Sequence, residues 1–359
     1  MFNEFQRTRA GGYFKQALKI YQRLDDLWGA GICLLGLGNI LYSDLVTGRS
    51  YLLQAIEIFE EVENVRGLVR ALSLLFNAVA LQGDRETVEQ LFSRYMTLVS
   101  NLEHPLFYTE TLLVNEMYHF VKGEFALATS FVARSIDFNE DLGRDTSFDS
   151  DALAMWYLHA DQFERGLAVL RQVRVELEQA AIDNDWRLAF NLHISAMLAL
   201  AEKEFQKAKD YLQQALATFQ VNDDVLGIAG AETFTAVALI GLGDTRSGRH
   251  HLVSSLKVAL DQKAINNLTE TLSGIALLLA HQEDLIRSRE IYELLWTVPT
   301  FRNSALYQRI AGNKICELTA ALTAEDQQTI KQRVADRNIW QEAAALLVEL
   351  KAASWENKN

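Results

Sequence analysis

The chain has 359 residues, 49% of them hydrophobic, with only 2 prolines and 19 glycines. Turn-rich β folds draw heavily on both residue types, so this composition disfavours them and permits long helices. The formal net charge of −13 argues against nucleic acid as a partner, because phosphate binding needs clustered Lys and Arg side chains and no basic run is present.

The first predicted helix covers residues 3–24 and places Ala17, Ile20, Tyr21 and Leu24 in helical phase. It fits the second helix of a hairpin whose first helix is missing, which would leave apolar surface exposed. We expect this end to pair with another chain, or to follow an N-terminal effector domain that the sequence does not contain. Residues 1–10 have no apolar run, which argues against a signal peptide.

A helix–turn–helix pattern then recurs with a period of 40 residues. Its turns lie between two apolar helical runs, and one turn is predicted slightly out of phase. The predicted turn positions are Gly83, Gly123, 160–161, Lys203, Gly243 and Glu283.

A small residue recurs five positions after each turn, where it would let the two helices of a hairpin approach closely. At one repeat the position is Ala168, or Gly166 if the turn is shifted. The other members are Gly48, Val88, Ala128, Ala208, Gly248 and Ser288.

The connections between hairpins share the same period. Residues 25–29, 63–67 and 223–227 each place polar residues where one helix ends and caps the next. Apolar residues fall on one helical face over 52–62 and 207–219, and no run of strict alternation competes. We therefore predict an all-α fold: a right-handed α-α superhelix of about seven hairpins with a concave inner surface, covering residues 1–303.

The remaining residues, 304–359, are predicted to be C-terminal capping helices of the same solenoid. One helix is expected over 304–322, and Thr323 is expected to cap the next, with an acidic residue three positions later. A final helix over 338–351 would place Trp340, Ala344, Leu347 and Leu350 on one stripe.

These features resemble the tetratricopeptide repeat (TPR), on the strength of Leu37-Gly38-Asn39 and of residues 123–125 at a hairpin turn. The longer period and the helix entry at 25–29 are similar to arrays in bacterial STAND-type signal-transduction ATPases and LuxR- or maltose-regulator-like transcription regulators. The resemblance covers about residues 12–300. It implies that the array acts as a sensor arm and binds peptides through the first helix of each hairpin.

One position on those first helices defines what we call the groove phase. Its members are Asn39, Asn77, Met117, Tyr157, Met197, Val237 and Leu277. The amides of Asn39 and Asn77 can bind a peptide backbone as donor and acceptor. The carboxylate clamp that some members of the family use also needs lysines or arginines nearby, and Arg70 is the only candidate here, which disfavours that mode. The later, apolar members indicate either a hydrophobic groove or packing between helices.

The aromatic residues Trp156, Tyr157, Trp186 and Trp296 are either partner anchors or core residues.

No catalytic motif survives inspection. The sequence lacks a phosphate-binding loop, a dinucleotide fingerprint, a zinc-protease motif and a nucleophile elbow. His250 and His251 are adjacent and so diverge on a helix, which does not suit metal binding. The aspartates at 183, 185, 223 and 224 are expected to cap helices. We therefore predict no enzyme activity, cofactor or metal.

Cys33 and Cys316 are expected to be unpaired and buried in a reducing compartment. The longest apolar stretch, residues 275–280, is too short to cross a bilayer. We expect a cytoplasmic protein without a membrane partner.

Three hypotheses follow. The leading one is a protein-interaction scaffold or sensor arm of a bacterial regulatory system that binds a protein segment or peptide in the groove. The second is a sensor of a small ligand or signalling peptide whose superhelix changes curvature on binding. The third and weakest is an enzyme on helical hairpins. A long open groove favours the first, a pocket with converging polar groups the second, and a perturbed carboxylate pair in a cleft the third.

Overall fold

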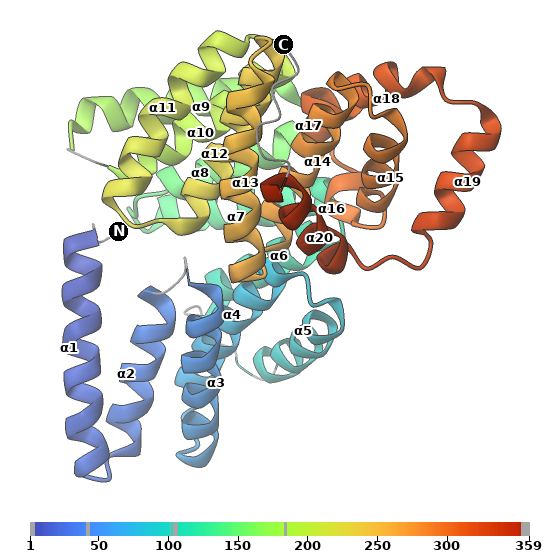
Figure 1. Cartoon of the computed structure of the whole chain (residues 1–359). Helices are drawn as coiled ribbons and strands as arrows, with labels where there is room; N and C mark the ends of the chain where they lie inside the picture. Colours follow the sequence, from blue (N-terminus) through green and yellow to red (C-terminus); the bar gives the residue numbers. More distant parts are fainter. Residues whose placement is uncertain (1–3, 41–43, 101, 103–106, 183–184, 353–359) are drawn as a thin grey trace.

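A computed structural model describes residues 4–40, 44–100, 102, 107–182 and 185–352 (Figure 1). The chain starts with α1 (Glu4–Arg23), followed by paired antiparallel helices. The seven pairs are α2 (Leu27–Ile40) with α3 (Leu45–Glu61), α4 (Val65–Gln82) with α5 (Arg85–Val99), α6 (Tyr108–Val121) with α7 (Phe125–Asp141), α8 (Ser147–His159) with α9 (Phe163–Ala180), α10 (Trp186–Ala201) with α11 (Phe205–Val221), α12 (Val225–Gly241) with α13 (Thr245–Gln262), and α14 (Ile265–His281) with α15 (Leu285–Leu295).

A run of short helical pieces follows the last hairpin. These are α16 (Pro299–Arg302), α17 (Ala305–Tyr307), the π-helix η2 (Gln308–Gly312), α18 (Asn313–Leu318) and the 3₁₀ helix η3 (Thr319–Ala321). Two longer helices, α19 (Ala324–Val334) and α20 (Ile339–Ala352), complete the described chain. The prediction of an all-α superhelix of helical hairpins is confirmed.

The hairpin turns follow the predicted period. Each of the six turns from the α4–α5 hairpin onward has one residue with positive φ, a conformation that glycine adopts without a steric penalty. These residues are Gly83, Gly123, Asp161, Lys203, Gly243 and Glu283. Asp161 confirms the shifted turn, which explains why the local sequence is out of phase.

The small residues after the turns lie at close helix contacts, as predicted. A Cβ atom added to Gly166 would lie 3.0 Å from the carbonyl oxygen of Ala154 on the facing helix. At Gly248 the corresponding distance, to the carbonyl oxygen of Ala236, is 3.1 Å. Gly166 therefore occupies the contact position, and Ala168, the other possibility, is exposed.

The predicted aspartate caps are present where the structure describes them. Asp185 and Asp224 accept hydrogen bonds from backbone N–H groups at the starts of α10 and α12. Asp223 is the positive-φ residue of the preceding turn, and Asp183 lies outside the described residues. These carboxylates thus stabilise helix starts.

Polar contacts between successive hairpins also follow the repeat. The indole Nε1 of Trp156 donates to Glu116, and the amide of Asn191 donates to Asp151, both over 2.7 Å and both between residues 40 positions apart. The solenoid is therefore held by periodic buried hydrogen bonds as well as by apolar packing.

The solenoid curves until its two halves touch. The backbone N–H of Leu45 donates to Gln262 over 3.1 Å, and Arg85 donates to the carbonyl of Thr297 over 2.8 Å. A small apolar cluster of Leu45, Ala78 and Ala264 lies beside the first of these contacts. Helices α3 to α5 are thereby joined to the region from α13 to the loop after α15, and we call this contact the closure.

The C-terminal helices cover the last hairpins. Helix α19 packs against α15 and α20 packs against α13. Thr323 caps α19 in a capping box with Asp326, as predicted. The predicted stripe on the final helix is wrong at Ala344, which is exposed; Ala343 and Leu346 are the buried residues.

Helix α4 has the length and apolar composition to cross a membrane, although 61% of it is buried within the protein. Its apolar side chains, including Phe76 and Leu72, belong to the core that the first hairpins share. Packing within the solenoid accounts for its composition.

Candidate functional site

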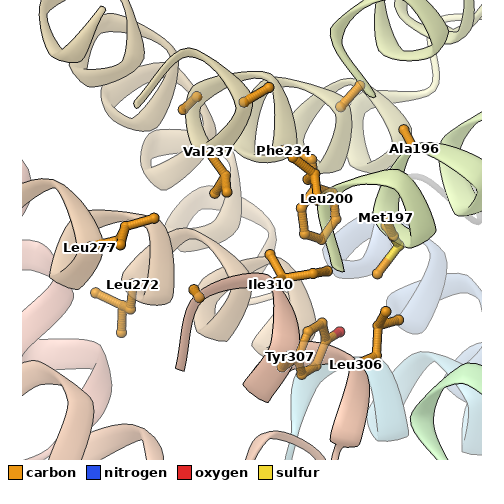
Figure 2. Packing of buried hydrophobic residues seen from close by; sticks show 14 of the residues in the cluster. Ala196, Met197, Leu200, Phe234, Val237, Leu272, Leu277, Leu306, Tyr307 and Ile310 are labelled. Carbon is orange, nitrogen blue, oxygen red and sulfur yellow. The ribbon is translucent and has the colours of Figure 1, made fainter. Parts of the chain in front are cut away.

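The groove phase differs between the two ends of the solenoid. From α8 onward its members are buried: Tyr157 is 7% exposed, Met197 2%, Val237 1% and Leu277 4%. Figure 2 shows that Leu306, Tyr307 and Ile310 pack among the side chains of α10, α12 and α14, where they cover Met197, Val237 and Leu277. We call residues 304–312 the inner segment. The structure therefore supports packing, rather than an open hydrophobic groove, at Tyr157 and Met197.

Buried hydrogen bonds fix the inner segment in place. The hydroxyl of Ser304 lies 2.7 Å from Nδ1 of His159, and the Tyr307 hydroxyl donates to Glu270 over 2.7 Å. Burial lowers the pKa of His159 to about 3 and raises the pKa of Glu270 to about 7. Both side chains are therefore uncharged at mildly acidic pH, as burial among apolar residues favours.

The N-terminal end presents the opposite picture. Asn39 is exposed, and it lines one cavity of about 20 Å³ together with Asn77 and Arg49. That volume holds about one water molecule. The structure thus brings the two predicted asparagines together, and the buried Oδ1 of Asn77 has no hydrogen-bond partner within the described residues.

The other two predicted residues already have protein neighbours. The Arg70 side chain is 42% exposed and lies 3.2 Å from Glu110, so an incoming carboxylate would have to compete with this ion pair. Met117 is half-buried and packs against the cores on both sides of α6.

The sequence predicted exposed apolar surface at the N-terminal end of the chain but did not single out Trp28 or Ile32 on α2. Trp28 is 54% exposed and Ile32 37%, and both share a helical stripe with Asn39. Of the residues predicted to share one helical phase, Ile20 on α1 and Leu24 just after α1 are exposed. Tyr21 packs against Gly29.

The remaining aromatic residues divide between the two alternatives. Trp156 is 3% exposed and belongs to the core, and Trp186 is half-buried and donates to Asp224. Trp296 is 40% exposed. The prediction for the cysteines is right for Cys33, which is buried, and wrong for Cys316, which is exposed.

Two further carboxyl groups have strongly shifted pKa values. Burial raises the pKa of Glu116 to about 8 and that of Asp151 to about 7. Each lies inside the helix packing. Neither lines the cavity at Asn39 or the larger cavity between residues 80–121 and 265–340. They are structural partners of Trp156 and Asn191, respectively.

A larger cavity of about 380 Å³ lies at the closure. Its walls come from residues 80–121 and from residues 265–340, which are far apart in sequence. We call it the closure cavity. Sequence reasoning missed it because a 40-residue period describes neighbouring hairpins and carries no information on where the solenoid meets itself.

No protein-family model matches the sequence, and no curated protein does. A Rap protein complexed with competence and sporulation factor is similar in structure, with a TM-score of 0.58 and 14% sequence identity over 89% of this chain and 90% of the Rap chain. The chain has a TPR-like helical-repeat fold. BtubC from P. vanneervenii aligns with a TM-score of 0.37 and 12% identity over 72% of this chain and 92% of that one. At 14% identity the similarity to the Rap protein establishes the fold alone.

Proposed function

We propose that the chain is a protein-interaction scaffold that binds a protein segment or peptide at its N-terminal hairpins. One observation carries the proposal: the groove phase and the adjoining apolar residues are exposed on α2, whereas the inner segment buries the same phase from α10 onward. Large exposed aromatic and aliphatic side chains are the usual anchors of an interface.

The side chains of this surface can bind an extended peptide through both its side chains and its backbone. Trp28 and Ile32 would lose exposed apolar area on binding, and the Asn39 amide would offer one donor group and one acceptor to a peptide bond. The Rap protein, which has a similar fold, is complexed with competence and sporulation factor. That likeness supports a binding role for this architecture.

The proposal extends to the class of protein. We infer a cytoplasmic sensor or scaffold arm of a bacterial regulatory system, which acts by binding and not by catalysis. The role as a sensor or scaffold arm is supported by the 40-residue period, which resembles that of sensor arms in bacterial regulators. A role in binding and not in catalysis is supported by the placement of Glu116 and Asp151. Their carboxyl groups have shifted pKa values but lie inside the helix packing, where a substrate cannot reach them.

A pull-down from a bacterial lysate with the full chain would test the proposal. Replacing Asn39 and Asn77 with alanine, or Trp28 with alanine, should abolish capture of a specific partner while circular dichroism shows unchanged helicity. The matched control replaces Asn313 and Gln341, which are exposed elsewhere, with alanine and should retain the partner. Unchanged capture by both surface variants would remove this surface from the site.

The second hypothesis, a small-ligand sensor, is favoured by a different observation. The closure cavity is a pocket with polar groups, and it lies where a change in curvature would open or close the solenoid.

A further inference from the structure

The closure cavity has the size of a ligand site. Its volume of about 380 Å³ is within the roughly 300–1,000 Å³ typical of small-molecule pockets. Apolar side chains supply much of the wall, among them Val88, Val121, Ile265, Val298, Ile339 and Trp340. A ligand with an apolar chain or ring would therefore leave water on entering it.

The polar groups on its wall favour an acceptor. Arg85 lines the cavity, and one of its guanidinium nitrogens donates to the carbonyl of Thr297. Within the described residues, no ion pair involves Arg85, and none of the residues lining the cavity is an Asp or a Glu. In a chain with a net charge of −13, a cavity with one cation and no carboxylate is electrostatically distinct.

Two neighbouring groups add to this pattern. Thr300 is 4% exposed, and its hydroxyl has no hydrogen-bond partner in the described part of the chain. Buried polar groups without partners are rare in folded proteins and call for a specific explanation. Asn338 also lines the cavity; its Oδ1 accepts from the backbone N–H groups of Trp340 and Gln341, which leaves its NH₂ group as the available donor.

We propose that the closure cavity binds a small monocarboxylate with an apolar body. The carboxylate would accept hydrogen bonds from the guanidinium of Arg85 and the hydroxyl of Thr300, and the body would pack against Trp340 and the aliphatic wall. Charge-assisted hydrogen bonds from a guanidinium to a carboxylate are among the stronger polar contacts in proteins. The same wall offers no anionic partner to an amine.

Occupancy of this cavity bears on the shape of the solenoid. One side of the wall belongs to the N-terminal hairpins and the other to α14 and the segments that follow. A ligand that contacts both sides binds the closed form better than an opened one and stabilises the closure by mass action. This inference is independent of the surface on α1 and α2, which does not line the cavity.

Isothermal titration calorimetry on the full chain would test the proposal with four probes: octanoate, 3-phenylpropionate, octan-1-ol and octylamine. At least one of the two carboxylates should bind at one saturable site. Octan-1-ol should bind at least about tenfold more weakly, and octylamine should not bind. The ratio follows from the loss of one charge-assisted interaction.

Variants locate the site. Arg85→Gln should weaken carboxylate binding by about tenfold or more and leave octan-1-ol unchanged, whereas the exposed control Arg171→Gln should change neither. Thr300→Val should weaken the carboxylate several-fold, and Val121→Phe should block all probes by filling the cavity. Circular dichroism would establish that each variant is folded.

Several results would overturn the proposal: no binding of either carboxylate to the unmodified chain, equal binding of octylamine, or an Arg85→Gln variant with unchanged carboxylate affinity. The chain with Asn39 and Asn77 replaced by alanine should bind octanoate normally. Failure of the N-terminal surface as a partner site would therefore be distinguishable from failure of this one.

Discussion

The hairpins at the two ends of the solenoid are built alike and present different surfaces. Both have left-handed turn residues at the same period, for example Gly83 in the N-terminal half and Gly243 in the C-terminal half. Yet the groove phase is exposed at Asn39 and buried at Val237. The difference comes from the inner segment, which belongs to no repeat. A repeat pattern therefore specifies how helices pair, and a non-repeating segment decides which part of the inner surface is available.

The largest expected effect tests whether the inner surface is packed in the C-terminal half and exposed at the N-terminal end. Leu306 is fully buried in the inner segment, so Leu306→Ala should lower the free energy of unfolding by about 2–5 kcal/mol through lost packing and a residual cavity. Ile32 is 37% exposed on α2, so Ile32→Ala should cost about 1 kcal/mol or less. Chemical denaturation followed by circular dichroism would measure both.

Equal losses in the two variants would contradict the comparison, because they would show that the inner surfaces are equally packed. A change in the denaturant dependence of either variant would identify a transition that is not two-state, in which case the midpoints of the separate transitions would be compared.

The next effect concerns Glu116, which joins the two regions through Trp156. Burial holds its folded-state pKa near 8, above the ordinary value of 4.5, so the folded protein retains a proton that the unfolded chain releases. This contribution to stability is fully present below about pH 4.5 and is lost as the pH rises through 8. Glutamine keeps the neutral form, so Glu116→Gln should be about as stable as the unmodified chain at pH 5 and more stable by up to about 4 kcal/mol at pH 9.

Thermal unfolding at several pH values would check this difference, since other titrating groups act equally in both proteins. The exposed Glu57→Gln variant is the control for the loss of a carboxylate elsewhere on the surface. A constant difference for Glu116→Gln would show that the carboxyl group is not held in its neutral form.

The sequence was sufficient for the local structure. The repeat period, the turn at 160–161, the aspartate caps and the start of α19 at Thr323 all follow from short-range rules on turns and caps. These rules act over a few residues, so one sequence contains them in full. Asn39 and Asn77, which the sequence placed on one groove phase, line the same cavity.

The same short-range rules could not predict contacts between residues far apart in the sequence. Met197 has the polarity of either a groove or a core residue, and only the course of residues 304–312 decides between the two. That segment has no repeat partner from which its position could be inferred. The closure was missed for the same reason, because its contacts join residues more than 200 positions apart, such as Leu45 and Gln262.

A smaller effect would sharpen the view that the two ends share one hairpin design. A Cβ atom at Gly166 would meet the backbone oxygen of Ala154, so Gly166→Val should lower the free energy of unfolding by about 1–3 kcal/mol. Ala168, two residues along the same helix, is exposed, and Ala168→Val should cost about 0.5 kcal/mol through helix propensity alone. Similar losses in the two variants would mean that Gly166 is not the close-contact position.

The smallest effect addresses the closure, where the two regions meet. Gln262 accepts a hydrogen bond from the backbone N–H of Leu45, and Gln262→Ala removes that acceptor at a cost of about 0.5–1.5 kcal/mol. The loss should be local, because the first hairpins share a core of their own. Hydrogen exchange should accelerate in α2 and α3 and stay unchanged in α12 and α14. The exposed Gln220→Ala variant should alter neither region. Uniform acceleration in both would show that the N-terminal hairpins and the later ones open as one unit, and the contrast between them would then be confined to their surfaces.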